Sequence, residues 1–294
     1  RGKAMTTSRF DIHEHITTQI ITAIEQGVGD FQLPWRHAGQ ISRPRNVRTK
    51  QAYRGVNILA LWAAAYSFGY TSATWGTYRQ WAETGAQVRK GEKASYVVFY
   101  KELEFAREDA ADAETETRLF ARATPVFAAE QVDGFKTELA GNDREVEPIA
   151  AAESFVMAAG ATINHGGDRA YYRPSTDSIQ LPERHAFVGS ATSTPQEDYY
   201  STLLHELTHW TAPEHRCDRT LGKRFGDDAY AMEELVAELG AAFLCADLGI
   251  TAAPRLDHAQ YIASWLKVLK ADKKAIFNAA GAASKAVAFL GGSG

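Results

Sequence analysis

The chain has 294 residues, of which 45% are hydrophobic, so it is long enough for one or two domains with a sizeable core. It has two cysteines and no run of about 20 apolar residues. These features exclude a disulfide framework and a membrane-spanning helix, and we therefore expect a cytoplasmic protein with no membrane partner. The net charge of −4 is unevenly distributed: residues 1–101 carry +8, residues 102–147 carry −8 and residues 148–294 carry −4.

Hydrophobic periodicity predicts both helices and strands in the first half of the chain. We expect helices at 10–28, from about 57 to 67 and at 74–83, and strands at 95–100 and from 124 onward. Residues 106–117, rich in alanine and acidic side chains, are expected to form a flexible loop. The polar segment 138–148 is the best boundary, which predicts domains at 5–145 and 146–294.

The second half reads as mainly helical with a small β-sheet. We expect a helix at 150–160, two short strands at 170–172 and 178–181, two helices that carry the candidate site, and helical periodicity over 258–290. The fold class is therefore α+β, with a mixed helix and antiparallel-strand domain first. If strand 178–181 lies at a sheet edge, an extended peptide could pair with it.

The segment His205-Glu206-Leu207-Thr208-His209 is the HExxH pattern of metal-dependent peptidases. Two histidines four residues apart leave one helix face together and can bind one divalent ion. Glu206 can then act as the catalytic base that takes a proton from water. A capping box with proline at 194–197 predicts the helix start. The alternative, two unrelated surface histidines, is disfavoured by the uncharged flanking residues.

A third metal ligand is expected from the apolar helix at 231–244, which contains three carboxylates. We assign Glu234 as the ligand and Glu238, one turn later on the same face, as the carboxylate that orients a histidine. Glu233 is the rival ligand. Two histidines and one glutamate leave an open coordination position, as in catalytic sites. Zinc is the default ion for this set, and manganese is the alternative.

Basic residues of the first domain lie close to aromatic ones, a combination typical of single-stranded nucleic-acid binders. The candidate DNA-binding residues are Arg45, Arg48, Lys50, Tyr53, Arg54, Arg79, Arg89, Lys90 and Lys93. Tyr96 and Tyr100 share one strand face, whereas Trp62, Trp75 and Trp81 are expected in the core. The absence of a base-reading motif predicts sequence-tolerant, salt-dependent binding.

Five segments resemble the ArdC antirestriction family. Residues 53–57, 75–81 and 85–93 are similar to the ArdC N-terminal domain, which also occurs at the front of TraC-type plasmid primases. Residues 205–211 and 233–244 are similar to the zincin-type metallopeptidase domain of ArdC. The resemblance implies a plasmid-encoded protein that binds single-stranded DNA and protects incoming conjugative DNA from host restriction.

Two other functions stay open at this point. In the first, a metallopeptidase uses its basic domain to recognise an acidic protein partner, and a protein of the host restriction system is a candidate substrate. In the second, the protein only binds its partner, and the metal stabilises the fold.

Overall fold

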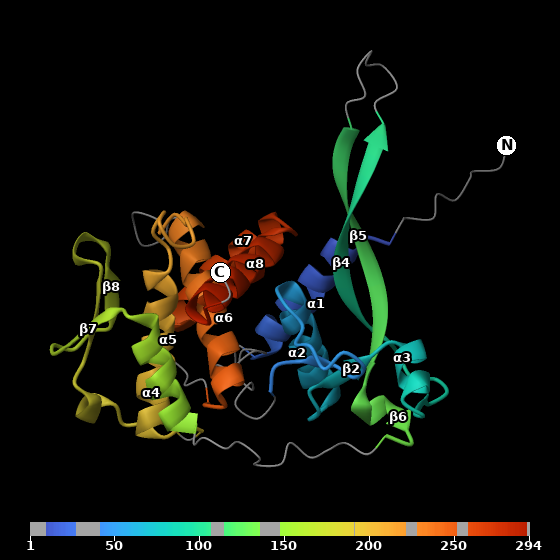
Figure 1. Ribbon diagram of the computed structural model, residues 1–294, viewed down its shortest axis with the longest axis horizontal. Coiled ribbons are helices and arrows are strands. Elements are labelled where there is room, and N and C mark those ends of the chain that lie inside the picture. Colours follow the sequence, from blue (N-terminus) through green and yellow to red (C-terminus); the bar gives the residue numbers. More distant parts are fainter. Residues whose placement is uncertain are drawn as a thin grey trace.

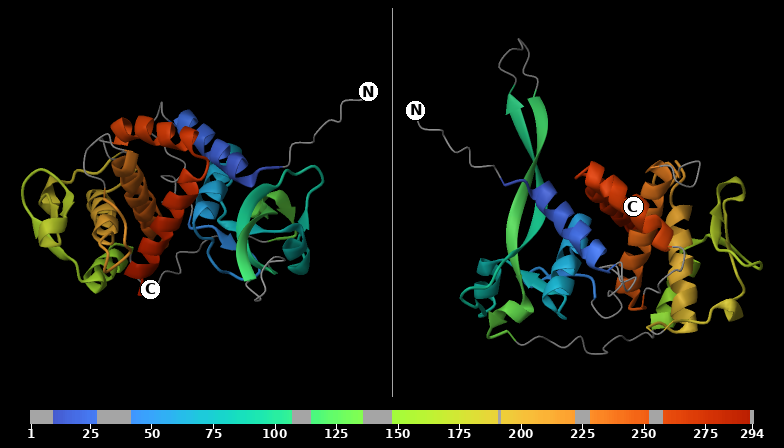
Figure 2. Two further views of the ribbon diagram at one scale, coloured as in Figure 1. Left: turned by 90° about the horizontal axis from the view of Figure 1, so that it is seen from above. Right: turned by 180° about the vertical axis from the view of Figure 1, so that it is seen from behind.

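The computed structural model describes residues 10–27, 42–106, 115–135, 148–190, 192–221, 228–251 and 258–292. An α+β half, built from the first part of the chain, lies beside a mainly helical half (Figure 1). A long two-stranded ribbon projects from the first half, and the C-terminal helices lie between the two halves in each view (Figure 2). The predicted α+β class is confirmed.

The first half is organised around α2 (Val56–Phe68), whose first ten residues are all buried. Helix α1 (Ile12–Gly27) packs on it through isoleucines at every fourth position, all of them buried: Ile12, Ile16, Ile20 and Ile24. A four-stranded sheet has the order β1-β2-β5-β4. Its strands are β1 (Arg45–Asn46), β2 (Thr74–Gly76), β4 (Ser95–Ala106) and β5 (Thr115–Ala128). A small second sheet pairs β3 (Gln87–Val88) with β6 (Val132–Asp133), next to the 3-10 turn η3 (Ala129–Gln131).

The single helix predicted at 74–83 is wrong, because its first residues form β2. Trp75 and Gly76 pair with β5, and only then does Thr77 cap the short helix α3 (Tyr78–Glu83) in a capping box. A Cβ on Gly76 would lie 2.6 Å from Val47 Cγ1, so glycine permits the close approach of two chain segments. Strand pairing therefore overrides the helical periodicity of the tryptophans.

The ribbon of β4 and β5 is longer than predicted. The two strands pair continuously from Ser95↔Val126 to Ala106↔Thr115, so the flexible loop predicted at 106–117 is wrong at its two ends, and β5 begins nine residues before residue 124. The backbone N–H and C=O groups of each strand form hydrogen bonds with those of the other strand. This pairing does not require an alternation of hydrophobic and polar residues in the sequence. Residues 107–114 lie outside the described residues, as does the boundary predicted at 138–148 except for its last residue.

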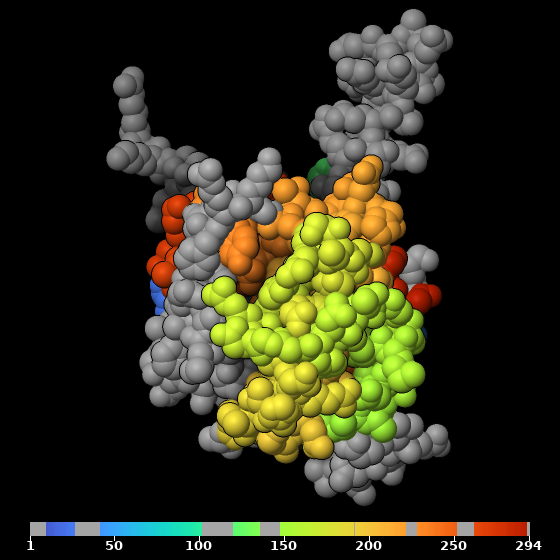
Figure 3. Space-filling view, turned by 90° about the vertical axis from the view of Figure 1, so that its left-hand side faces the viewer, coloured from blue at the N-terminus to red at the C-terminus, as the bar shows by residue number. Residues whose placement is uncertain are grey.

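The second half contains the helices and the small sheet expected from the sequence. Its helices are α4 (Pro148–Ala159), α5 (Pro195–Trp210), α6 (Asp228–Leu248), α7 (His258–Ala271) and α8 (Ala275–Leu290). Its strands are β7 (Thr162–His165), β8 (Tyr171–Arg173) and β9 (Ser178–Leu181), with 3-10 turns η4 (Pro174–Thr176) and η5 (Arg184–Ala186). The sheet forms much of one outer face (Figure 3). Because β7, which was not predicted, pairs in parallel with β9, β9 is the central strand. The condition for peptide pairing at 178–181, a free sheet edge, is therefore not met.

The two halves share one hydrophobic core. Trp62 of α2 and Phe243 of α6 have ring centroids 5.8 Å apart, and α8 lies against both helices. The backbone N–H of Gly55 donates to Ser284 Oγ at 2.9 Å. Trp62, Trp75 and Trp81 are buried, as predicted. Either half alone would therefore expose a large apolar surface.

None of the described helices combines the length and the apolar character that a membrane span needs.

Candidate metal centre and nucleic-acid interface

The metal-centre candidates lie on two helices, α5 and α6, that cross in close contact. The predicted capping box starts α5: the Thr194 hydroxyl accepts from the Glu197 N–H, and Pro195 takes the first helical position. Where the helices meet, Gly240 of α6 lies against Thr208 of α5, and a Cβ there would be 2.6 Å from Thr208 Cγ2. Glycine thus lets α6 bring its glutamates to the histidines of α5.

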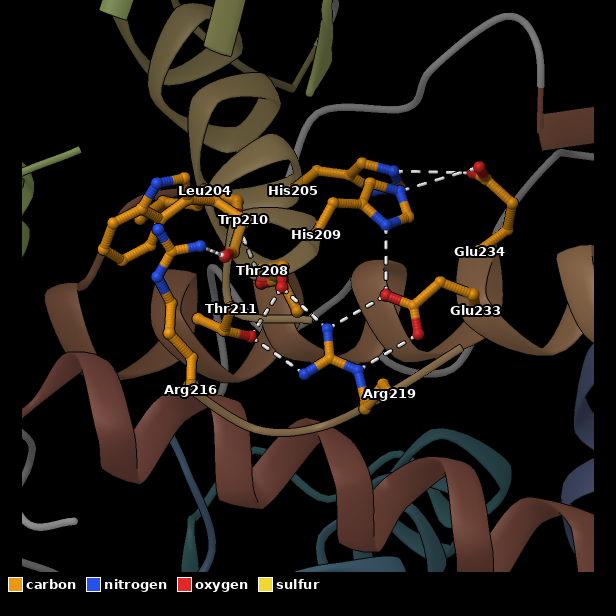
Figure 4. A network of polar contacts seen from close by, with 10 residues as sticks. All are labelled: Leu204, His205, Thr208, His209, Trp210, Thr211, Arg216, Arg219, Glu233 and Glu234. Atoms are coloured by element: carbon orange, nitrogen blue, oxygen red, sulfur yellow. Dashed lines mark hydrogen bonds and ion pairs between the residues drawn. The ribbon is translucent and has the colours of Figure 1, made fainter. Parts of the chain in front are cut away.

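His205, His209 and Glu234 come together at this crossing (Figure 4). Glu234 Oε2 lies 3.5 Å from His205 Nε2, and Glu234 Oε1 lies 3.6 Å from His209 Nε2. Donor atoms that share an ion at about 2.0–2.2 Å lie roughly 3–4 Å from one another, so these separations suit a divalent cation. Two imidazoles and one carboxylate are also the donor types of catalytic zinc sites.

Glu233 points to the other side of His209. Its Oε1 lies 3.2 Å from His209 Nδ1, and its carboxylate accepts two hydrogen bonds from Arg219, at 3.0 and 2.9 Å. Arg219 also donates to Thr211 Oγ1 and to the Thr208 carbonyl on α5 (Figure 4). A carboxylate held in this way fixes the ring orientation and keeps Nε2 of His209 directed at Glu234.

The structure therefore gives the histidine-orienting role to Glu233, whereas the sequence analysis predicted it for Glu238. Glu238 approaches Nδ1 of His205 only to 3.9 Å, whereas Glu233 makes the direct contact with a histidine. Glu233 is not part of the cluster of three donor groups. Sequence reasoning missed Arg219, because it follows α5 in an irregular segment whose spacing carries no signal. Glu206 is buried on α5, next to His205.

Electrostatics at the crossing favour a cation. Burial by itself would lower the pKa of His209, but the hydrogen bonds to Glu233 and Glu234 outweigh it and raise this pKa to about 10. Burial likewise disfavours the ionised glutamates, yet the two histidines hold the pKa of Glu234 well below its usual value. His209 and Arg219 lower the pKa of Glu233 in the same way. Both carboxylates are ionised at neutral pH, and together they attract positive charge.

The predicted DNA-binding cations fall into two groups. Arg48 and Arg79 both pair with Glu83, at 3.1 and 2.9 Å, and Arg89 pairs with Glu92 at 2.9 Å. The second group is exposed and makes no ion pair within the described part of the chain: Arg45, Lys50, Arg54, Lys90 and Lys93. The turn that carries Arg48 and Lys50 is organised by Asn46, whose Oδ1 accepts from the N–H groups of residues 48 and 49.

Part of this basic region surrounds a groove of about 790 Å³. The groove is lined by Arg43, Asn46, Thr49, Gln51, Ala52, Tyr53, Arg54, Asn57, Gln80 and Phe99. Tyr53 is buried, and its hydroxyl accepts from Asn46, so little of its ring is accessible for base stacking. Tyr53 and Arg54 are the two predicted DNA-binding residues that line the groove, whereas the other seven do not: Arg45, Arg48, Lys50, Arg79, Arg89, Lys90 and Lys93. Sequence reasoning missed Phe99 as a lining residue.

Arg43 connects the groove to the second half of the molecule. Its guanidinium donates to Asp247 Oδ2, near the end of α6, at 2.6 Å. Arg43 and Arg54 also line a second cavity of about 280 Å³ that reaches α8. The ion pair between Arg43, which lines the groove, and Asp247 therefore connects the groove to α6, the helix that carries Glu234.

The comparisons with known proteins identify a family for each half of the chain. Residues 150–282 match the zincin-like metallopeptidase family, and residues 10–132 match the N-terminal domain of the anti-restriction factor ArdC. The chain thus combines a zincin-like domain with an ArdC-type N-terminal domain. The crystal structure of the metal-free antirestriction ArdC protein from the R388 plasmid has a TM-score of 0.80 and 39% identity, over 97% of this chain and 98% of that one. Its Mn(II)-bound structure has a TM-score of 0.76 and 40% identity, with the same coverage.

Two curated relatives extend the comparison. The uncharacterized protein y4eC of Sinorhizobium fredii is 48% identical over 96% of this chain and 93% of its own length. A DNA primase TraC of Escherichia coli is 38% identical over 93% of this chain, which spans only 19% of that primase. This chain belongs to the ArdC antirestriction protein family. Its zincin-like domain and its Mn(II)-bound relative point to a divalent metal.

Proposed function

We propose that this protein binds single-stranded DNA through its basic first half and protects incoming conjugative plasmid DNA from host restriction. The observation that carries the proposal is the group of exposed cations without ion pairs in the described first half, in a chain of the ArdC family. Such cations bind phosphates and release counterions, which supports affinity without sequence specificity. The proposal assigns DNA binding to residues 5–145, metal chemistry to residues 146–294, and the protein to the cytoplasm, where entering DNA meets restriction enzymes.

The second half supplies a metallopeptidase-type centre. His205, His209 and Glu234 would hold the ion, which we propose to be zinc, with manganese as the alternative suggested by the R388 relative. When bound, the ion supplies Lewis-acid chemistry that polarises a peptide carbonyl and makes water more acidic. Glu206 takes the proton of the attacking water and passes it to the leaving amine. Glu233 and Arg219 hold the His209 ring in place. A protein of the host restriction system is the proposed substrate.

The test of DNA binding is a fluorescence-anisotropy titration of the full chain with labelled single-stranded and double-stranded oligonucleotides at several salt concentrations. We expect tighter binding to the single strand and an affinity whose logarithm falls linearly with the logarithm of salt concentration. Absence of salt-sensitive binding would remove the physical basis of the proposal.

The alternative function is a metallopeptidase whose basic half recognises an acidic protein. One observation favours it: Arg48, Arg79 and Arg89 already pair with carboxylates of the same chain, so this surface accepts acidic side chains. Competition between an acidic peptide and a single-stranded oligonucleotide for the full chain separates the two functions.

A further inference from the structure

The projecting ribbon carries an aromatic and cationic patch that the sequence analysis did not find. Phe99 lies directly opposite Arg122, and Lys101 lies directly opposite Phe120. Directly paired residues of an antiparallel ribbon project from the same face, and so do residues two apart on one strand. The four side chains therefore form a two-by-two patch with the aromatic rings on one diagonal and the cations on the other. We call it the ribbon patch.

All four side chains of the ribbon patch are exposed. Phe99 is 50% exposed and Phe120 is 42% exposed, which is unusual for phenylalanine, and Lys101 and Arg122 are also exposed. Large aromatic rings in water that alternate with cations mark a surface suited to stacking flat, negatively charged ligands.

The opposite face of the same strand packs against the N-terminal part of the chain. Tyr96 makes an edge contact with His15 of α1 at 5.4 Å between ring centroids, and the Tyr100 hydroxyl lies 3.0 Å from His13 Nε2. The tyrosines that the sequence suggested as stacking platforms thus project toward α1. Tyr100 is 48% exposed, so both faces of the ribbon carry exposed rings, and the ribbon patch differs in that each of its rings is paired with a cation.

Phe99 also connects the patch to the basic groove, because it is a lining residue of that groove. Arg43 and Arg54 are the charged residues among those that line the groove, and no carboxylate is among them. Asn46, Gln51, Asn57 and Gln80 add side-chain amides to the lining. The volume of about 790 Å³ lies in the range of ligand sites, roughly 300–1,000 Å³. The groove therefore suits an anion that also carries hydrogen-bonding groups.

We infer that single-stranded DNA runs along the ribbon patch into the groove, with bases stacked on Phe99 and Phe120 and phosphates beside Lys101, Arg122 and Arg54. This inference rests on the proposed DNA-binding function and names the surface that performs it. An acidic peptide would use the cations but has no flat bases for the two rings. Duplex DNA keeps its base faces stacked inside the helix, so the patch discriminates against it.

The test measures the affinity of full-length variants for a labelled single strand of about 16 nucleotides, the upper end of common site sizes. Phe99→Ala and Phe120→Ala should each weaken binding on the order of tenfold. Phe99→Trp and Phe120→Trp, which retain a ring, should restore it. Lys101→Ala and Arg122→Ala should each reduce the salt slope by about 0.7. The matched control is Phe68→Ala: Phe68 is 58% exposed and ends α2, away from the groove lining.

The outcomes separate this inference from the proposed function. If the wild type binds the single strand but Phe99→Ala and Phe120→Ala bind as tightly as Phe68→Ala, the inference is wrong and the proposed function stands. If the wild type does not bind, both fail. If poly-glutamate displaces the oligonucleotide and its own binding also depends on the two rings, the ligand is not single-stranded DNA. Weak binding in the alanine variants and restored binding in the tryptophan variants support the inference. A folding defect would not depend in this way on whether the new side chain is aromatic.

Discussion

Gly240 offers a direct test of how the crossing of α5 and α6 builds the metal centre. In Gly240→Ala, the new Cβ would lie 2.6 Å from Thr208 Cγ2 and 2.7 Å from Thr208 Oγ1, closer than real Cβ contacts. Thr208 is fully buried, and its hydroxyl donates to the Leu204 carbonyl at 2.8 Å, so it cannot rotate away without losing that bond. We therefore expect α6 to move away from α5 and to carry Glu234 with it.

The expected stability change has two opposing parts. Alanine in place of glycine in a helix interior stabilises by roughly 1 kcal/mol, and overpacking costs about 1–3 kcal/mol. The net change in the free energy of unfolding for Gly240→Ala is then a loss of about 0–2 kcal/mol. Gly281 is the matched control, because it is also helical, lies in α8 and has no heavy atom within 4 Å of the point that an alanine Cβ would occupy. Gly281→Ala should gain up to about 1 kcal/mol.

Denaturant unfolding of both variants measures the difference, and isothermal titration with Zn²⁺ or Mn²⁺ measures the metal affinity. We expect Gly240→Ala to be about 1–3 kcal/mol less stable than Gly281→Ala and to bind metal more weakly. Thr208→Ala removes the two nearest atoms and leaves Cβ at 3.2 Å, so it should relieve much of the penalty in a double variant. Equal stability of the two alanine variants, or no relief from Thr208→Ala, would refute the reasoning.

Three further variants, with four predicted outcomes, concern charged groups. Glu206→Gln should retain metal binding and thermal stability but abolish peptide hydrolysis, measured on the purified chain; unchanged hydrolysis would exclude Glu206 as the base. In a conjugation assay into a restricting host, the same variant should protect DNA like the wild type, and complete loss of protection would contradict a sufficient role for DNA binding. Glu233→Gln should weaken metal affinity about 10- to 100-fold because the support of His209 is lost, and an unchanged titration curve would count against that role. Arg43→Met should destabilise the fold by about 1 kcal/mol at neutral pH, because partial burial raises the pKa of Asp247, Arg43 opposes this rise, and solvent screens the pair. Loss of Arg43 should raise the folded-state pKa of Asp247 further, so the deficit relative to the wild type should grow as pH rises through the wild-type folded-state pKa, which lies above 3.8. Lys90→Met, at an exposed lysine that does not act on Asp247, is the control, and a deficit that does not change with pH would contradict the assignment.

Local periodicity and capping determined most of the helical framework. The isoleucine spacing of α1, the capping box of α5 and the apolar run of α6 are each signals within one segment, and each helix forms where its pattern predicts it. The HExxH spacing belongs to the same class, since residues four apart on a helix share a face in any fold. The sequence alone therefore placed the two histidines and three candidate glutamates.

Contacts between segments were decided by the tertiary structure. The length of the ribbon, β2 in place of the first turn of a helix, and the pairing of β7 with β9 all depend on a partner strand that lies elsewhere in the chain. A strand gains its hydrogen bonds from that partner, so its own residues carry only part of the signal.

The roles of the three glutamates also depend partly on the sequence and partly on the tertiary structure. Glu233 and Glu234 are adjacent, so they leave α6 about 100° apart, and the sequence assigned Glu234 as the ligand but left Glu233 as its rival. The close approach at Gly240 sets the position of α6 on α5, and this directs Glu234 to both Nε2 atoms and Glu233 to Nδ1 of His209 beside Arg219. The sequence by itself determined which groups could form the centre, because helix geometry is local; packing between helices and register between strands determined which groups meet.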